Sequence, residues 1–179
     1  MKVSLPLYES KSTHINFVEF KLAVAAGAHV IATTSSDEKS KFLLDLGAEH
    51  VINYKTTPEW GAAARALTPG GVGFNIIVDV GGPSTLPEAV KAIKIRGVVS
   101  LVGFLSGFNY TTTAGDILFS GSIFKPVAVG SRADLKDLVA EIEKHNIQPA
   151  INKRIFSFEE AKEAVNLLIS QKQIGMFLM

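Results

Sequence analysis

Cysteine is absent from the chain of 179 residues, and its absence excludes several kinds of chemistry at once. A chain without cysteine has no disulfides, no thiolate nucleophile, no iron–sulfur cluster and no zinc site that needs sulfur ligands. The four histidines, His14, His29, His50 and His145, lack the short spacings that metal sites use. We therefore expect no bound zinc or other metal, and a structural role for the histidines at the strand starts.

An excess of charge of one sign and a long apolar run are also lacking. Lys and Arg total 18 against 17 Asp and Glu, and no stretch collects the basic residues. Nucleic acid and anionic membranes attract basic patches, so neither is an expected partner. No apolar stretch reaches the roughly 18 residues of a membrane span, and residues 1–10 lack the apolar core of a signal peptide. These features predict a soluble, cytoplasmic protein.

Short apolar runs and helical spacings alternate along the chain. The runs are rich in β-branched residues, as in parallel strands that are covered on both faces, and the segments between them repeat apolar residues every three or four positions. The predicted strands cover 29–33, 51–54, 75–80, 98–103 and 126–129, and the predicted helices cover 13–27, 37–46, 60–67, 84–94 and 132–144. This alternation predicts an α/β fold with a doubly wound parallel sheet. Periodicity alone does not choose between a Rossmann-like, NAD(P)-binding fold and flavodoxin-like or response-regulator folds.

The same patterns give expectations about packing and boundaries. A further strand from Val3 to Tyr8 contains Pro6, which points to an edge strand or an irregular start. The expected inner faces are Ile15, Val18, Leu22 and Ala25 on the first helix, and Leu135, Leu138 and Ile142 on the helix that Ser131 caps. Residues 1–150 are predicted to form the dinucleotide-binding domain, with an atypical first strand and turn. Residues 151–179 are predicted to form a C-terminal appendage of a helix and a strand.

The corner after the strand at 29–33 lacks the acidic residue that dinucleotide-binding folds use there for a free ribose 2′-hydroxyl. Thr34, Ser35 and Ser36 occupy this corner, and Lys39 follows in the next helix. Hydroxyls and a cation suit a 2′-phosphate, so the corner favours NADP(H) over NAD(H). The alternative is that a serine only caps the helix and that Lys39 is solvated.

The exact amino-acid sequence of several segments is more informative about the family than their periodicity. These segments are AAGAHVIATTSSDEKSKFLLDLGAEHVINYKTTPEWG, VDVGGPSTLPEAVKAIKIRGVVSLVGFLSG, VGSRADL and FSFEEAKEAVNLL. They closely resemble the cofactor-binding half of medium-chain dehydrogenases/reductases, in the branch of zinc-type alcohol dehydrogenases and quinone oxidoreductases. The resemblance covers about Ala23 to Ser170 and implies a Rossmann-like, NAD(P)-binding fold and an NADP(H)-dependent oxidoreductase.

The resemblance also implies where the cofactor lies. Serines and a lysine hold the adenosine phosphate with a tyrosine beside them, and the ends of two strands approach the nicotinamide. The residues implied or predicted are Thr34, Ser35, Ser36, Lys39, Tyr54, Val80, Gly81, Gly82, Val102, Gly103 and Phe104. Glycines at the carboxyl ends of parallel strands leave room for a ligand to approach the backbone. The alternative is that Gly81, Gly82 and Pro83 only form a turn and a helix start.

Two departures from the family pattern bear on activity. The glycine-rich turn that binds pyrophosphate falls on Lys11, Ser12, Thr13 and His14, where every glycine is missing. We expect weakened rather than abolished binding, because a capped helix end and a lysine remain. The second departure is that family members place a catalytic domain ahead of this half. The segment from Ile151 to Met179 resembles the part that packs on that domain.

Three functional interpretations stay open. In the first, the chain is an oxidoreductase in which hydride passes between nicotinamide C4 and a small carbonyl, alcohol or enone. No catalytic residue is identified, although the hydroxyls near the nicotinamide are candidate proton donors: Ser100, Ser106, Tyr110, Thr111, Thr112 and Thr113. In the second, it is a non-catalytic cofactor-binding or interaction module, and in the third a fragment of a longer enzyme. A homodimer through the edge strand near Val127 is expected.

Overall fold

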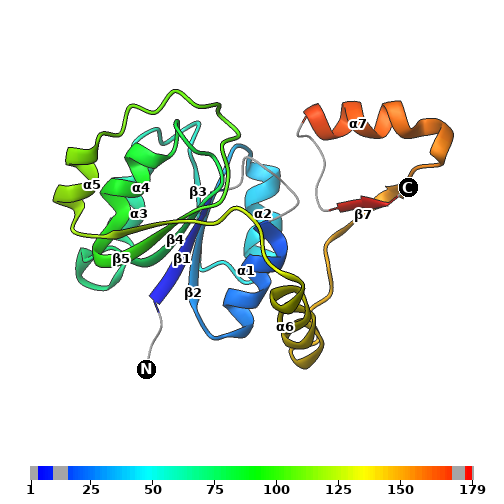
Figure 1. Cartoon of the computed structure of the whole chain (residues 1–179), viewed down its shortest axis with the longest axis horizontal. Coiled ribbons are helices and arrows are strands. Elements are labelled where there is room, and N and C mark those ends of the chain that lie inside the picture. Colours follow the sequence, from blue (N-terminus) through cyan, green and yellow to red (C-terminus); the bar gives the residue numbers. More distant parts are fainter. Residues whose placement is uncertain (1–3, 10–15, 171–175, 179) are drawn as a thin grey trace.

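Six parallel strands form the central sheet of the computed structural model, which describes residues 4–9, 16–170 and 176–178 (Figure 1). The strands are β1 (Ser4–Glu9), β2 (His29–Thr34), β3 (His50–Asn53), β4 (Phe74–Asp79), β5 (Ile93–Leu101) and β6 (Ile123–Pro126). Their order across the sheet is β3-β2-β1-β4-β5-β6. This is the 3-2-1-4-5-6 order of dinucleotide-binding Rossmann folds, and it differs from the flavodoxin-like order. The predicted fold class is therefore confirmed.

Helices α1 (Asn16–Ala25), α2 (Asp37–Asp45), α3 (Trp60–Ala66), α4 (Leu86–Ala92) and α5 (Ala114–Ser120) cover both faces of this sheet. The chain continues with α6 (Arg132–Lys144) and α7 (Ala161–Ser170), and short 3₁₀ turns lie at Pro69–Gly71 and Phe158–Glu160. Figure 1 shows α1 and α2 on one face and α3, α4 and α5 on the other. Because both faces are covered, central strand residues such as Ile31, Ile77 and Val99 are buried.

β1 lies in the middle of the sheet, so the expectation of an edge position for its proline was wrong. β1 pairs with both β2 and β4, and Pro6 lies opposite Ile76 of β4. The expectation of an irregular start was confirmed, because the pairing with β2 shifts register between Ser4 and Leu7. Proline lacks a backbone donor, and an irregularity in the ladder is where a central strand accommodates that loss.

The inner face of α1 differs from the predicted one. Phe20 is fully buried and Ala23 and Val24 pack against the same core, whereas Ala25 is exposed. Ile15 lies outside the described residues. The sequence of α1, NFVEFKLAVA, carries apolar residues on more than one side. The predicted Val18 and Leu22 are half-buried but lie outside this core, so spacing alone did not select the face that packs on the sheet.

α6 begins where predicted but packs differently. Ser131 caps it in a reciprocal arrangement with Asp134, whose carboxylate accepts from the Ser131 backbone N–H. Within the described part of the chain no residue of α6 is buried, and Leu135 is 59% exposed. The prediction that Leu135 and Leu138 face the core was wrong, because both are exposed. Ile142, for which the same was predicted, is half-buried, so the prediction was partly met there. The helix is amphipathic, but its apolar face meets too little of the described chain to be covered.

Two element boundaries in the second half of the sheet also differ from the prediction. β6 ends at Pro126, where a strand was predicted to begin, and its position at the sheet edge is as expected. Proline has no N–H for continuing a ladder. β5 begins at Ile93 and includes a register shift before Val98, whereas a helix was predicted to reach Lys94.

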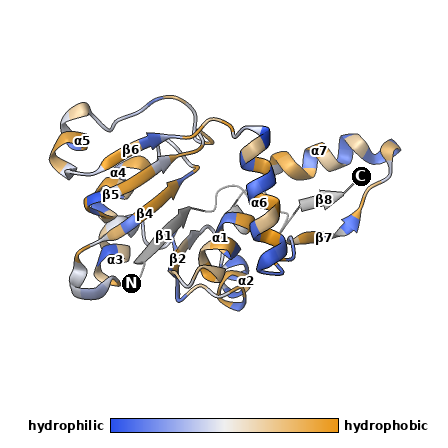
Figure 2. Ribbon diagram, turned by 60° about the horizontal axis from the view of Figure 1, so that its bottom comes forward, coloured by the Kyte–Doolittle hydropathy of each residue, from blue (hydrophilic) through white to orange (hydrophobic). Residues whose placement is uncertain are grey.

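The last residues form a second, smaller sheet. β7 (Ile151–Ile155) pairs in parallel with β8 (Met176–Leu178), and α7 connects them. Figures 1 and 2 show this unit to one side of the main sheet, beyond α6. Arg154 links the unit internally through ion pairs with Glu160 and Glu163. A domain division at residues 150 and 151 stays a prediction. Among the described helices none has the length and apolar character needed to cross a membrane.

Candidate cofactor-binding site

The carboxyl ends of β2 and β3 form a polar corner. Ser36 is the N-cap of α2, and its Oγ accepts a hydrogen bond from the Lys39 backbone N–H at 3.3 Å. The capping role of this serine is therefore confirmed, and the cap leaves the hydroxyl beside the positive end of the helix dipole. Asn53 at the end of β3 donates to the Asp37 carboxylate at 3.0 Å, which ties the start of α2 to the neighbouring strand.

Two lysines interact through their charges at this corner. Burial lowers the pKa of the Lys39 ammonium, the Glu38 carboxylate raises it, and the charge of Lys55 lowers it further. Lys55 follows Tyr54, and its backbone N–H donates to Asn53 Oδ1 at 3.1 Å. A bound dianion would offset both the burial and the repulsion between the two cations. Sequence reasoning missed Lys55, because it lies 16 positions beyond Lys39 and its only signal was adjacency to Tyr54.

Thr34 is the last residue of β2 and is 0% exposed. Its carbonyl oxygen accepts from the Tyr54 backbone N–H at 3.0 Å, so the ends of β2 and β3 are held in register. Its Oγ1 has no hydrogen-bond partner among the described residues. Buried hydroxyls are usually paired, so an orphaned one at a strand end fits a site that a polar ligand completes. The predicted turn at Lys11, Ser12, Thr13 and His14 lies outside the described residues.

The second half of the predicted site is built around Asp79, which ends β4 and is 2% exposed. Its Oδ1 accepts from the Gly82 backbone N–H at 2.9 Å and from Thr85 Oγ1 at 2.7 Å. Its carbonyl oxygen accepts from the backbone N–H groups of Val102 at 2.8 Å and Gly103 at 3.3 Å. One residue thus joins the loop after β4 to the loop after β5.

Gly82 and Gly103 are required by contacts between these two loops. Gly82 has a φ of +79°, and a Cβ there would lie 2.9 Å from Phe104 Cα. A Cβ on Gly103 would lie 2.6 Å from the Val80 carbonyl oxygen. The contacts show that these glycines let two backbone segments touch. That they also leave room for a ligand stays a prediction. Gly82 also lies in the turn that precedes α4, since its carbonyl oxygen accepts from the Leu86 backbone N–H at 2.9 Å.

The candidate proton donors have different surroundings. Thr113 is the N-cap of α5 and exchanges hydrogen bonds with Asp116, so it is structural. The Ser106 hydroxyl is hydrogen-bonded to the backbone of the preceding loop. It donates to the Gly81 carbonyl oxygen at 2.7 Å and accepts from the Ser84 backbone N–H at 2.9 Å. Tyr110 is largely exposed. Among the described residues, none of these three hydroxyls hydrogen-bonds a histidine, so the geometry assigns no general base.

Metal binding has no support in residues 4–9, 16–170 and 176–178, where no three His, Asp or Glu side chains gather in a way that could hold an ion. The expectation of no bound zinc stays a prediction.

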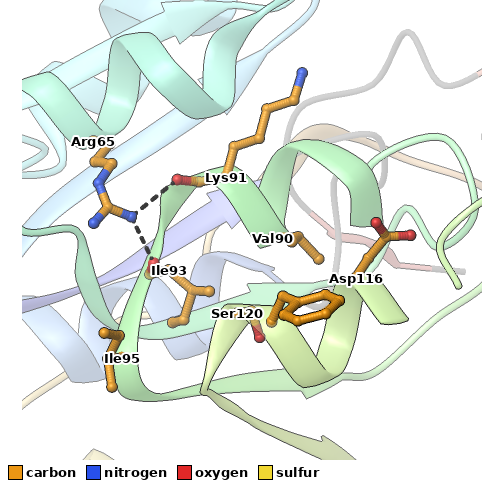
Figure 3. Close-up of a pocket in the computed structure, with 8 residues that line it drawn as sticks. Arg65, Val90, Lys91, Ile93, Ile95, Asp116 and Ser120 are labelled. Atoms are coloured by element: carbon orange, nitrogen blue, oxygen red, sulfur yellow. Dashed lines mark hydrogen bonds between the residues drawn. The ribbon is translucent and has the colours of Figure 1, made fainter. Parts of the chain in front are cut away.

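A cleft of about 430 Å³ opens between α3, α4 and α5 (Figure 3). Its residues are Arg65, Val90, Lys91, Ile93, Ile95, Asp116, Phe119 and Ser120. Arg65 Nη1 donates to the carbonyl oxygens of Lys91 at 3.2 Å and Ile93 at 2.9 Å, which satisfies the end of α4. Ile93 and Ile95 begin β5, so the cleft lies toward the amino ends of the strands. It is separate from the polar corner.

Glu19 on α1 is a buried carboxyl with an unusual titration. Burial raises its pKa from 4.5 to about 7, and its Oε2 has no hydrogen-bond partner within the described ranges. Between these two pH values the unfolded chain loses the proton while the folded chain keeps it. Stability therefore falls as pH rises from about 4.5 to about 7 and then levels off.

We expect Glu19→Gln to remove this slope. At pH 8 the variant should be more stable than the wild type by about 1 kcal/mol, a value discounted for partial solvent screening. Urea unfolding at pH 5 and pH 8 measures the difference, and Glu143→Gln, at an exposed position of α6, is the control. Parallel pH profiles for Glu19→Gln and the wild type would contradict the assignment.

The strand order and the polar corner define a dinucleotide-binding domain. The model of the zinc-binding dehydrogenase family matches residues 19–144, and the chain belongs to this family, within the medium-chain dehydrogenase/reductase superfamily. The family inferred from the sequence is thus confirmed.

The individual similarities agree with this assignment. A zinc-type alcohol dehydrogenase-like protein of Schizosaccharomyces pombe is 40% identical over 159 residues, which are 87% of this chain and 45% of that protein. Prostaglandin reductase-3 of Mus musculus is 26% identical over 87% of this chain and 46% of its own length. Quinone oxidoreductase of Escherichia coli, solved with NADPH, shares the fold with a TM-score of 0.85 at 21% identity, over 99% of this chain and 57% of that one. The chain spans about half the length of the curated relatives it matches.

Proposed function

We propose that this chain binds NADP(H) and forms the cofactor half of an oxidoreductase acting on a small carbonyl, alcohol, quinone or enone. The observation that carries the proposal is the pair Lys39 and Lys55 beside the Ser36 cap, where the pKa of Lys39 is lowered by burial and then by the second cation. Two cations and a hydroxyl at the end of β2 match a ribose 2′-phosphate better than a free 2′-hydroxyl. The Escherichia coli relative solved with NADPH supports the same cofactor.

The chain's own residues would bind and orient the cofactor. Lys39, Lys55 and Ser36 would hold the phosphate at the adenosine end, and Tyr54 lies directly after β3 beside them. The loops held together by Asp79 would face the nicotinamide, with the backbone from Val80 to Gly82 and from Val102 to Phe104 as a wall. When bound, NADP(H) supplies or accepts the hydride.

Titration with NADPH and NADH, followed by thermal shift and by nucleotide fluorescence, tests this proposal. We expect NADPH to stabilise the chain at lower concentration than NADH. Absence of binding by either cofactor at millimolar concentration would overturn it. Quinones, enones and aldehydes are then offered to the NADPH complex, and loss of absorbance at the nicotinamide band reports turnover.

A non-catalytic interaction module is the second candidate, and the exposed face of α6 favours it. Leu135, Leu138 and Val139 share this helix and are all exposed. An apolar helix face of this kind is typical of a docking surface. NADPH binding without oxidation by any of the offered carbonyls or quinones would place this interpretation ahead of the enzyme.

We also propose that two copies of the chain pair through the β6 edge. Ile123 on β6 and Leu118 and Phe119 on α5 are exposed, Phe119 to 89%. An unpaired strand edge beside apolar side chains is suited to pairing with a second copy.

Phe119→Glu is expected to turn a dimer into a monomer, because it places a charge in the apolar part of the edge. Sedimentation at micromolar concentration measures the mass of each form. Phe158→Glu is the matched control, since Phe158 is also a highly exposed phenylalanine, 81%, but lies next to α7. A wild type that sediments as a monomer, or equal effects of both substitutions, would refute the pairing.

A further inference from the structure

Ser106 joins the two loops at the carboxyl edge of the sheet. Its Oγ donates to the Gly81 carbonyl oxygen at 2.7 Å and accepts from the Ser84 backbone N–H at 2.9 Å. Its own backbone N–H also donates to Gly81 O, at 3.0 Å. Both the proton and an acceptor site of this hydroxyl are therefore used by backbone groups. A proton that is donated to a carbonyl oxygen is poorly placed to protonate a substrate, which argues against the role of proton donor.

The loop that carries Ser106 is itself compact. The rings of Phe104 and Phe108 stack with centroids 4.7 Å apart, and Gly107 N donates to Phe104 O at 2.8 Å. Gly107 has a φ of +96°, a conformation that glycine adopts without strain. Ser106 thus lies in a tight turn, and its hydroxyl fixes that turn against the loop from Gly81 to Ser84.

We propose that Ser106 is a positioning residue, which sets the spacing between the two backbone segments that hold the nicotinamide. The proposal rests on the proposed function, because those segments are the wall assigned to the nicotinamide end. Asp79 fixes the roots of both loops, at Gly82 and at Val102 and Gly103. Ser106 fixes them further out, so its loss frees the outer part of the wall while the roots stay joined. Held donors and acceptors bind better than mobile ones, since less ordering is needed on binding.

The adenosine end of the site provides an internal reference. Ser36 and Lys39 lie at the start of α2, directly after β2, and Lys55 lies just after β3, whereas Ser106 lies in the loop after β5. A fragment that contains only the adenosine end, 2′,5′-adenosine diphosphate, should therefore bind independently of Ser106. NADPH, which reaches both ends, should not.

The test measures the affinity of the full chain and of Ser106→Ala for NADPH and for 2′,5′-adenosine diphosphate by calorimetry. We expect Ser106→Ala to lower the affinity for NADPH about tenfold, which corresponds to about 1.4 kcal/mol. The affinity for the fragment should change less than about twofold. The fluorescence of bound NADPH should shift toward that of free cofactor. Ser106→Thr keeps a hydroxyl and should restore most of the NADPH affinity.

Ser170→Ala is the matched control, because the Ser170 hydroxyl also donates to a backbone carbonyl oxygen, that of Leu167 at 2.7 Å, but lies on α7. It should leave both affinities close to the wild type. The proposal is overturned if Ser106→Ala weakens the affinity for NADPH and for the fragment equally. It is also overturned if Ser106→Ala fails to fold and Ser106→Thr does not restore the NADPH affinity. In both cases Ser106 would only support the fold. A wild type that binds the fragment and not NADPH overturns it as well. A wild type that binds neither ligand shows that the proposed function itself is wrong.

Discussion

Lys39→Ala is expected to remove the preference of this chain for NADPH over NADH. A charge-assisted contact with a phosphate contributes about 1.5–3 kcal/mol, which corresponds to a loss of roughly 10-fold to 150-fold in NADPH affinity. NADH has no 2′-phosphate, so its affinity should stay nearly the same. Fluorescence titration of both cofactors against the wild type and the variant measures the change. The exposed Lys41 lies on the same helix, and Lys41→Ala is the control for a general loss of positive charge.

The lowered pKa of Lys39 adds a pH dependence to this prediction. Burial is the first cause of the lowering, and the charge of Lys55 contributes as well, while Glu38 opposes it. As pH rises through that lowered pKa, Lys39 loses its charge and NADPH affinity should fall, whereas NADH affinity should not. Lys55→Ala should move the fall to higher pH, because one cause of the lowering is removed. An equal loss of affinity for both cofactors in Lys39→Ala would show that the lysine stabilises the helix and does not bind the phosphate.

The parts of this site that the sequence predicted are local. β2, α2 and β3 follow from apolar runs, the Ser36 cap and the glycine after the helix, all of which act within a few residues. Gly47, with a φ of +109°, ends that helix as expected. Chemistry at the end of β2 could be inferred because the residues that create it are neighbours in the sequence.

The parts that the sequence did not predict depend on residues far apart in the chain. The charge of Lys55, which follows β3, lowers the pKa of Lys39, which follows β2. The Ser106 hydroxyl donates a hydrogen bond to the carbonyl oxygen of Gly81, 25 positions earlier. The exposed face of α6 is a similar case, since periodicity reports that a helix has an apolar side but not what covers it. The reason for the glycines was also non-local, because Gly103 contacts Val80 and not a neighbour in the chain.

Gly103→Ala therefore has the largest expected effect on the folded state. The new Cβ would lie 2.6 Å from the Val80 carbonyl oxygen and 3.0 Å from Val80 Cγ1. The Val80 side chain could rotate its Cγ1 methyl away from the new Cβ. The Val80 carbonyl oxygen could not, because it belongs to the backbone directly after β4. Moving Gly103 outward would stretch its hydrogen bond to Asp79 O, already 3.3 Å, and strain the shorter bond of Val102 to the same oxygen at 2.8 Å. Overpacking of this kind costs about 1–3 kcal/mol, and we expect the upper part of that range.

Urea unfolding measures this loss as a lower midpoint with an unchanged slope, since the same surface is exposed on unfolding. Gly115→Ala is the matched control, because among the described residues its new Cβ would meet only Oγ1 of Thr113, the N-cap of α5, at 3.4 Å. Alanine is favoured over glycine in a helix by roughly 0.5–1 kcal/mol, so this control should be neutral or slightly stabilised. An unchanged midpoint for Gly103→Ala would mean that the loops after β4 and β5 separate easily. In that event Asp79 and Ser106 would not hold a rigid wall, and the NADPH affinity of Gly103→Ala should then equal that of the wild type.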